Sequence, residues 1–118
     1  MDLGEVFLKT DVLVIGSGGA GSMAAIEAAE EGVNVLMVSK GEFPSGCTRV
    51  AMGAMQASMD PKDSPDLHFR DTILGGHFIN NQKLVRIMVN EAPKIVRRLE
   101  QFGTEFRKED DKYKLFPI

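Results

Sequence analysis

The sequence is poor in residues on which several classes of protein depend. It has one cysteine, Cys47, and no tryptophan among 118 residues. A lone thiol excludes an internal disulfide and a cysteine cluster for zinc or an iron–sulfur group within the chain, although a partner subunit could carry such a cluster. No stretch approaches the roughly 18 apolar residues that cross a bilayer. We therefore expect no metal site in this chain and no direct membrane span.

Charge is low and spread along the chain. The 14 Lys and Arg residues against 17 Asp and Glu residues leave a net charge of −3. Without a basic stripe there is no electrostatic basis for binding a phosphate backbone, so nucleic acid is not an expected partner. Asp2 and Glu5 stand where a signal peptide would carry positive charge. We predict a cytoplasmic location, with any attachment to the inner face of the cytoplasmic membrane made through partner subunits.

The first third of the chain has the pattern of a strand, a helix and a second strand. The apolar run from Asp11 to Ile15 stops at glycine and is typical of a parallel strand buried on both faces. An alanine-rich helix is predicted from about Gly18 to Glu31, followed by a second strand over 33–38. This order predicts an α/β fold with a Rossmann-like βαβ unit.

A glycine motif lies between the first strand and the helix. Gly16, Gly18 and Gly21 form the spacing GxGxxG within the segment GSGGAG. In this context the first glycine permits a tight turn, the second lets main chain approach a pyrophosphate, and the third lets the helix pack close to the sheet. The free amides and the positive dipole end of the helix then face the phosphates.

The end of the second predicted strand indicates which dinucleotide is bound. NAD sites usually place an Asp or Glu there to accept from the ribose hydroxyls, whereas this chain has Ser39 and Lys40. Ser39 can still bond a ribose hydroxyl, and Lys40 can lie near phosphate or adenine. A simple NAD dehydrogenase is therefore disfavoured.

After the second strand the chain changes character. Residues 39–58 lack periodicity and are predicted to form an irregular loop, so we divide the chain into a βαβ unit with its loop at 1–58 and an extension at 59–118 of the same domain. In the extension, Ser64 is a candidate N-cap with Pro65 at the first helical position, for a helix that continues to about Leu74.

A longer helix is predicted over 81–102, followed by a hairpin around the acidic turn at 109–111. Pro93 lies inside this helix and predicts a kink or a break into two helices. Apolar residues recur at three- and four-residue steps and predict one buried stripe. The stripe consists of Leu84, Met88, Ala92, Ile95, Leu99 and Phe102.

The segment VLMVSKGEFPSGCTRVAMGAMQAS, together with SPDLHFRDTILGG and the helix after it, resembles one family. The family comprises the flavoprotein subunits of succinate dehydrogenase and fumarate reductase, with their relative L-aspartate oxidase. The narrower signals are the serine and lysine after the second strand, the small-residue loop, and the pattern His68, Asp71, Thr72 and Gly75. The resemblance implies that FAD is the cofactor and that this chain is an incomplete domain.

The resemblance also assigns binding residues by position. Those that would hold the pyrophosphate are Gly16, Ser17, Gly18, Gly19, Ala20 and Gly21, with Ser39 and Lys40 on the adenosine side. Those that would line the flavin are Ser45, Gly46, Cys47, Thr48, Met52, Gly53 and Ala54. Cys47 takes the place of the histidine that bonds covalently to flavin in membrane-bound members, so we predict non-covalent FAD. Ala54 departs from a glycine that is frequent in relatives.

The implied activity is interconversion of succinate and fumarate or of a similar dicarboxylate. No catalytic residue is assigned within these 118 residues, because the family's acid–base groups lie in later segments. His68 is expected to make a structural hydrogen bond near Asp71 or Thr72, and His77 is expected in a loop. The implied partners are the remainder of the flavoprotein and an iron–sulfur subunit. An L-aspartate oxidase and a non-catalytic FAD-domain fragment or assembly subunit remain alternatives.

Overall fold

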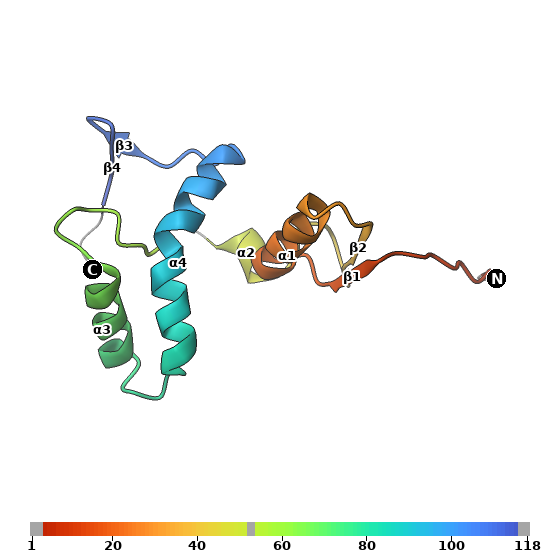
Figure 1. The fold of residues 1–118 in the computed structure, drawn as a ribbon. Helices are drawn as coiled ribbons and strands as arrows, with labels where there is room; N and C mark the ends of the chain where they lie inside the picture. Colours follow the sequence, from red (N-terminus) through yellow and green to blue (C-terminus); the bar gives the residue numbers. More distant parts are fainter. Residues whose placement is uncertain (1–3, 52–53, 116–118) are drawn as a thin grey trace. The chain divides into compact units, whose positions relative to one another are not determined.

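The computed structural model describes residues 4–51 and 54–115. The chain forms two compact units, Met1–Gly53 and Ala54–Ile118, shown in Figure 1. Each unit is described by itself. The division into domains after residue 58 stays a prediction.

The first unit is a βαβ arrangement. Strand β1 (Val12–Ile15) leads through the glycine turn into helix α1 (Gly19–Glu30), and strand β2 (Val35–Val38) follows. The strands pair in parallel from Val12 opposite Val35 to Ile15 opposite Val38. Helix α1 contacts both strands. The predicted α/β class and the order of these elements are confirmed.

Only one face of this small sheet is covered. Val12 and Val14 are half-buried, whereas Leu13 is 53% exposed and Ile15 is 81% exposed. The expectation that this strand is buried on both faces is therefore wrong for the described residues. Helix α1 covers one side, and the residues that alternate to the other side of the pleat keep their apolar surface open.

The loop after β2 is more ordered than its composition predicts. A short helix, α2, spans Cys47–Val50 within the segment that we expected to be irregular. An ion pair between Arg49 and Glu42 links this helix to the start of the loop. The sequence did not predict this helix, because four residues are too few to produce a periodic pattern.

The second unit is built on two helices. Helix α3 (Pro65–Gly75) begins as predicted, with the Ser64 hydroxyl accepting from the Leu67 amide at 3.1 Å and Pro65 at its first position. Helix α4 (Gln82–Gln101) is capped by Asn81 and packs beside α3 (Figure 1). Short caps of this kind satisfy amides that the first helical turn leaves without partners.

Helix α4 differs from its prediction in two respects. It continues through Pro93 as one helix, so it is not broken in two there, and the alternative of a kink stays a prediction. The predicted buried stripe is only partly correct: Ala92 is buried and Ile95 and Leu99 are half-buried, whereas Leu84 is 62% exposed and Met88 and Phe102 are exposed too. The residues that the structure buries are Val85, Val89, Ala92 and Val96. Val85 and Val89 pack with Ile73 and Phe69 of α3, and this packing stabilises α4 although Pro93 cannot donate a helical hydrogen bond.

The predicted hairpin is present. Strands β3 (Lys108–Glu109) and β4 (Lys112–Tyr113) pair antiparallel, so Glu109 belongs to a strand and not to the turn. Asp110 and Asp111 both have positive φ, at 50° and 61°. Two such residues are what a tight two-residue hairpin turn requires, and aspartate tolerates that conformation.

Candidate functional site

The glycine turn between β1 and α1 is built as the motif predicts at its first and third positions. Gly16 has a φ of +109°, which side chains rarely allow, and its amide donates to the Val38 carbonyl at 2.8 Å. A Cβ on Gly21 would lie 2.0 Å from the Gly16 carbonyl oxygen. Both glycines are therefore required by the protein's own main chain, the first for the turn and the third for close packing of the helix.

The second glycine has a different status. Gly18 has a φ of −79°, and a Cβ there would meet only the Ser45 carbonyl and the Thr48 hydroxyl, at 3.6 and 3.7 Å. These are ordinary contacts, so nothing in the described protein demands glycine at this position. A ligand that approaches the main chain would demand it, as the motif predicts for a pyrophosphate.

Hydrogen bonds bring the predicted serines together beside this turn. Ser17 is 1% exposed, and its Oγ donates to Ser39 Oγ at 3.1 Å and lies 2.7 Å from Ser45 Oγ. Ser39 Oγ donates to Ser45 Oγ at 3.0 Å. The Ser45 amide also donates to the Ser17 carbonyl at 3.2 Å. The turn, the end of β2 and the loop before α2 are thus tied at one point.

Thr48 makes a further link to the start of α1. The Gly19 amide donates to Thr48 Oγ1 at 2.9 Å, and this amide belongs to the first helical turn, which has no partners inside the helix. Thr48 and its exposed neighbour Cys47 lie at the start of α2. The structure therefore places Thr48, one of the residues assigned to the flavin side, next to the predicted phosphate turn.

Other predicted residues are not gathered in this way. Ala20 and Lys40 are exposed, the latter just after β2. Ala54 lies in the second unit, and Met52 and Gly53 lie outside the described residues. The missed feature is the role of Ser17 as a link. Its partners are 22 and 28 residues away, a separation that no local pattern reports.

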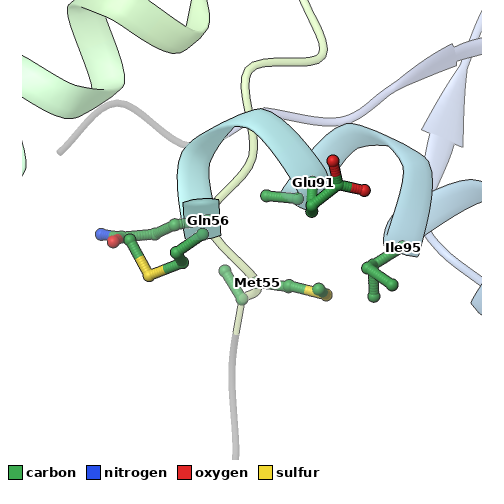
Figure 2. A pocket seen from close by; sticks show the side chains of 7 residues that line it. Met55, Gln56, Glu91 and Ile95 are labelled. Atoms are coloured by element: carbon green, nitrogen blue, oxygen red, sulfur yellow. The ribbon is translucent and has the colours of Figure 1, made fainter. Parts of the chain in front are cut away.

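The second unit carries a hollow of about 600 Å³ on helix α4 (Figure 2). Met55, Gln56, Glu91 and Ile95 line it, as do Ala54, Met88 and Ala92. The wall is mainly apolar, with one carboxylate and one amide. It shows no convergent set of polar groups that would define a catalytic site.

The histidines do not form a catalytic group within the described residues. Thr72 Oγ1 donates to the main-chain carbonyl of His68 at 2.7 Å, while both ring nitrogens of His68 are buried without a partner among the described residues. The expected side-chain bond to Asp71 or Thr72 is therefore not formed, and Asp71 pairs with Arg70 instead. His77 is an exposed loop residue, as expected.

The described residues contain no group of three or more acidic, histidine or cysteine side chains placed to hold a metal ion. In the same part of the chain, no helix combines the length and the apolar character that crossing a membrane requires.

A parallel strand pair, a glycine turn and a helix whose first amides face that turn define a dinucleotide-binding unit. The sequence matches the FAD binding domain family over residues 11–117, and the chain belongs to that family. FAD is therefore its cofactor, as the sequence predicted. The non-covalent mode of attachment stays a prediction.

Three similar proteins place the chain within the family. One component of the fumarate reductase (CoM/CoB) of Methanothermobacter marburgensis is 53% identical over 106 residues, which are 86% of this chain and 19% of that protein. L-aspartate oxidase of Streptomyces coelicolor is 38% identical over 99 residues, covering 84% and 17%. The structure of Mycobacterium smegmatis Sdh1 in complex with UQ1 matches with a TM-score of 0.82 and 42% identity, covering 88% and 18%. The chain thus spans about a fifth of the length of these relatives.

Proposed function

We propose that this chain supplies the FAD-binding part of a flavin-dependent oxidoreductase that interconverts succinate and fumarate or a similar dicarboxylate. One observation carries the proposal: the protein's own contacts do not require glycine at Gly18, whereas Gly16 and Gly21, the first and third glycines of the motif, are required by the main chain. Such a position is explained by a ligand phosphate close to the backbone. The 53% identity to the fumarate reductase component of Methanothermobacter marburgensis supports the choice of reaction.

Each part of the site has a distinct role in this proposal. The main chain from Gly16 to Gly21 would hold the pyrophosphate at the start of α1, where amides and the helix dipole favour negative charge. Ser39 and Lys40 would lie at the adenosine end. The flavin would contact residues 45–48 and, by resemblance to the family alone, residues 52–54.

FAD, once bound, supplies hydride transfer to and from the carbon–carbon bond of the substrate. The residues of this chain bind and orient; none of them is assigned to move a substrate proton. Acid–base groups would come from the remainder of the flavoprotein, outside these 118 residues. We call this chain together with that remainder the assembled flavoprotein. Its electron-transfer partner in the cytoplasm would be an iron–sulfur subunit.

The proposal includes non-covalent attachment of FAD. Cys47 is exposed at the start of α2, at the position where membrane-bound members carry the linking histidine. A small side chain packed beside the ring is the role we assign to it. Denaturation of the assembled flavoprotein should release all flavin, and a flavin mass retained on the chain would contradict this part.

A second candidate is an L-aspartate oxidase, favoured by the 38% identity to the Streptomyces coelicolor enzyme. The two activities are separated by assay of the assembled flavoprotein. Fumarate reduction by reduced viologen supports the first, and oxidation of L-aspartate supports the second. An assembly that binds FAD and does neither would indicate the non-catalytic alternative.

The decisive test of cofactor binding uses Gly18→Ala. Because the protein leaves ordinary space for this methyl group, we expect the thermal stability of the flavin-free assembly to stay unchanged while the affinity for FAD falls at least tenfold. Gly41→Ala is the matched control, since a Cβ there meets nothing within 4 Å and Gly41 is not assigned to the site. Equal FAD affinity in the two variants would defeat the proposal.

A further inference from the structure

Ser17, Ser39 and Ser45 form a closed ring of hydroxyl groups. Their Oγ atoms are separated by 3.1, 3.0 and 2.7 Å around the ring. The members come from the glycine turn, the residue after β2 and the loop before α2. Ser17 is the buried corner, while Ser39 and Ser45 are half-buried.

The number of protons decides what this ring can offer to a ligand. A serine hydroxyl has one hydrogen to donate and two lone pairs to accept with. Ser17 donates to Ser39, and Ser39 donates to Ser45. The hydrogen of Ser17 is already used, so Ser45 donates in the remaining 2.7 Å contact. Every hydrogen is thus spent inside the ring, and each oxygen keeps one lone pair.

Such a ring accepts hydrogen bonds and does not donate them. A phosphate oxygen, which only accepts, gains nothing from it and depends on main-chain amides instead. A ribose hydroxyl, which can donate, finds an acceptor at Ser39. In NAD sites, a carboxylate at the same strand end accepts this hydrogen bond from the ribose.

We propose that Ser17 is a positioning residue that makes Ser39 an acceptor for an adenosine ribose hydroxyl of FAD. The side chain of Ser17 is buried and would not touch the cofactor. Ser39 thus does what an acidic residue does in NAD sites. Ser17 acts on it indirectly, because its hydrogen bond to Ser39 directs the hydrogen of Ser39 away from the ligand and toward Ser45. The inference rests on the proposed binding of FAD to this chain.

Removal of Ser17 would break the ring at one corner. In Ser17→Ala the bond between Ser39 and Ser45 can persist, but nothing then fixes which of the two donates. Ser39 would lose its donor partner and part of its role as acceptor. The affinity gained from the ribose hydroxyls should fall in this variant, although the changed side chain lies away from the ligand.

The experiment compares FAD with an FAD analogue that lacks both hydroxyls on the adenosine ribose. Dissociation constants are measured with the assembled flavoprotein by quenching of flavin fluorescence. In the wild type we expect FAD to bind about fivefold more tightly than the analogue, the factor of one net hydrogen bond. In Ser17→Ala and Ser39→Ala this ratio should fall to less than about twofold, and Ser39→Thr, which keeps the hydroxyl, should restore it.

A purely structural role for Ser17 predicts another result. Loss of stability weakens both ligands equally and leaves their ratio at the wild-type value, which would overturn the proposal. Ser64→Ala is the control, because it removes the cap of α3 in the other unit and should lower the melting temperature with no change in the ratio.

If Ser17→Ala does not fold, Ser45→Ala opens the ring from a half-buried corner and should lower the ratio in the same way. An unchanged ratio in that variant would also overturn the proposal. Absence of FAD from the wild type would refute the proposed function, whereas FAD binding with an unchanged ratio would refute only the role of Ser17.

Discussion

The phenol of Tyr113 donates a hydrogen bond to the carboxylate of Glu100, which joins the hairpin to the last turn of α4. Lys108 Nζ lies 2.7 Å from the other oxygen of the same carboxylate. These bonds, the lysine first and the phenol second, lower the pKa of Glu100. The hydrogen bond to Glu100 likewise raises the pKa values of Lys108 and Tyr113.

The sign of each shift defines a pH window for the attachment of the hairpin. The contribution of Glu100 is present above its ordinary pKa of 4.5 and is lost as the pH falls through its lower folded value. The contributions of Tyr113 and Lys108 are complete below their ordinary values of 10.0 and 10.5 and are lost as the pH rises through the higher folded values. We expect the hairpin to be held best between these limits.

Tyr113 permits a direct measurement of this arrangement. It is the one tyrosine of the sequence, which has no tryptophan, so the tyrosinate absorbance of the 118-residue chain reports Tyr113 alone. The midpoint should lie above 10.0 in the wild type and return toward that value in Glu100→Gln. Glu109→Gln, which removes a carboxylate bound to Lys114, is the control and should leave the midpoint in place. Identical titrations in all three chains would contradict the contact.

The two apolar stripes of α4 give a second prediction. Val89 is 0% exposed and belongs to the stripe that the structure buries, whereas Leu84 belongs to the stripe that the sequence favoured. Val89→Ala should lower the free energy of unfolding of the 118-residue chain by about 2 kcal/mol, from lost burial and the cavity it leaves. Leu84→Ala should change it by less than about 0.5 kcal/mol. Denaturant titration measures both, and the reverse order of effects would show the predicted stripe to be correct.

Helix α4 also shows why the sequence could predict where a helix lies but not which of its faces is buried. Adjacent apolar residues occur as Leu84 with Val85, Met88 with Val89, and Ile95 with Val96. Two stripes one residue apart therefore fit the helical period equally well. The choice depends on which neighbour is present, and α3 packs on the valine side. Caps, glycines and strand runs are local signals, so the positions of most elements followed from them.

In the candidate site, too, local features could be predicted from the sequence and contacts between distant residues could not. The requirement for glycine at Gly16 and Gly21 could be predicted from the motif, because it arises from the path of the chain next to them. The links of Ser17 to Ser39 and Ser45 could not, since they depend on where the loop after β2 returns. The resemblance assigns Ser45 and Thr48 to the flavin side, and the structure joins both residues to the turn by hydrogen bonds.

Gly21 supports a third prediction, about the helix packing that the motif requires. In Gly21→Ala the new methyl group would overlap the Gly16 carbonyl, which belongs to the main chain and cannot turn aside. We expect a loss of about 3 kcal/mol or more in the stability of the chain, with loss of bound flavin as a consequence. Gly75→Ala, where a Cβ meets nothing within 4 Å, is the control and should remain stable. A Gly21→Ala variant that is stable and binds flavin would contradict the close approach of α1 to the Gly16 carbonyl.

Thr48 gives the fourth prediction, because it links α2 to the start of α1 through a single hydroxyl. Thr48→Val keeps the shape of the side chain but removes the acceptor for the Gly19 amide, and Thr48→Ser keeps the acceptor. The amide is exposed, so water can replace the lost partner in the flavin-free protein, and the stability should fall by only about 0.5–1 kcal/mol. Binding of FAD excludes that water, and the valine variant should therefore bind FAD several-fold more weakly than the serine variant. Chemical denaturation and flavin titration of the assembled flavoprotein provide the two measurements. Equal FAD affinity in the two variants would mean that the bond between Gly19 and Thr48 does not help to hold the loop against the turn when the cofactor is bound.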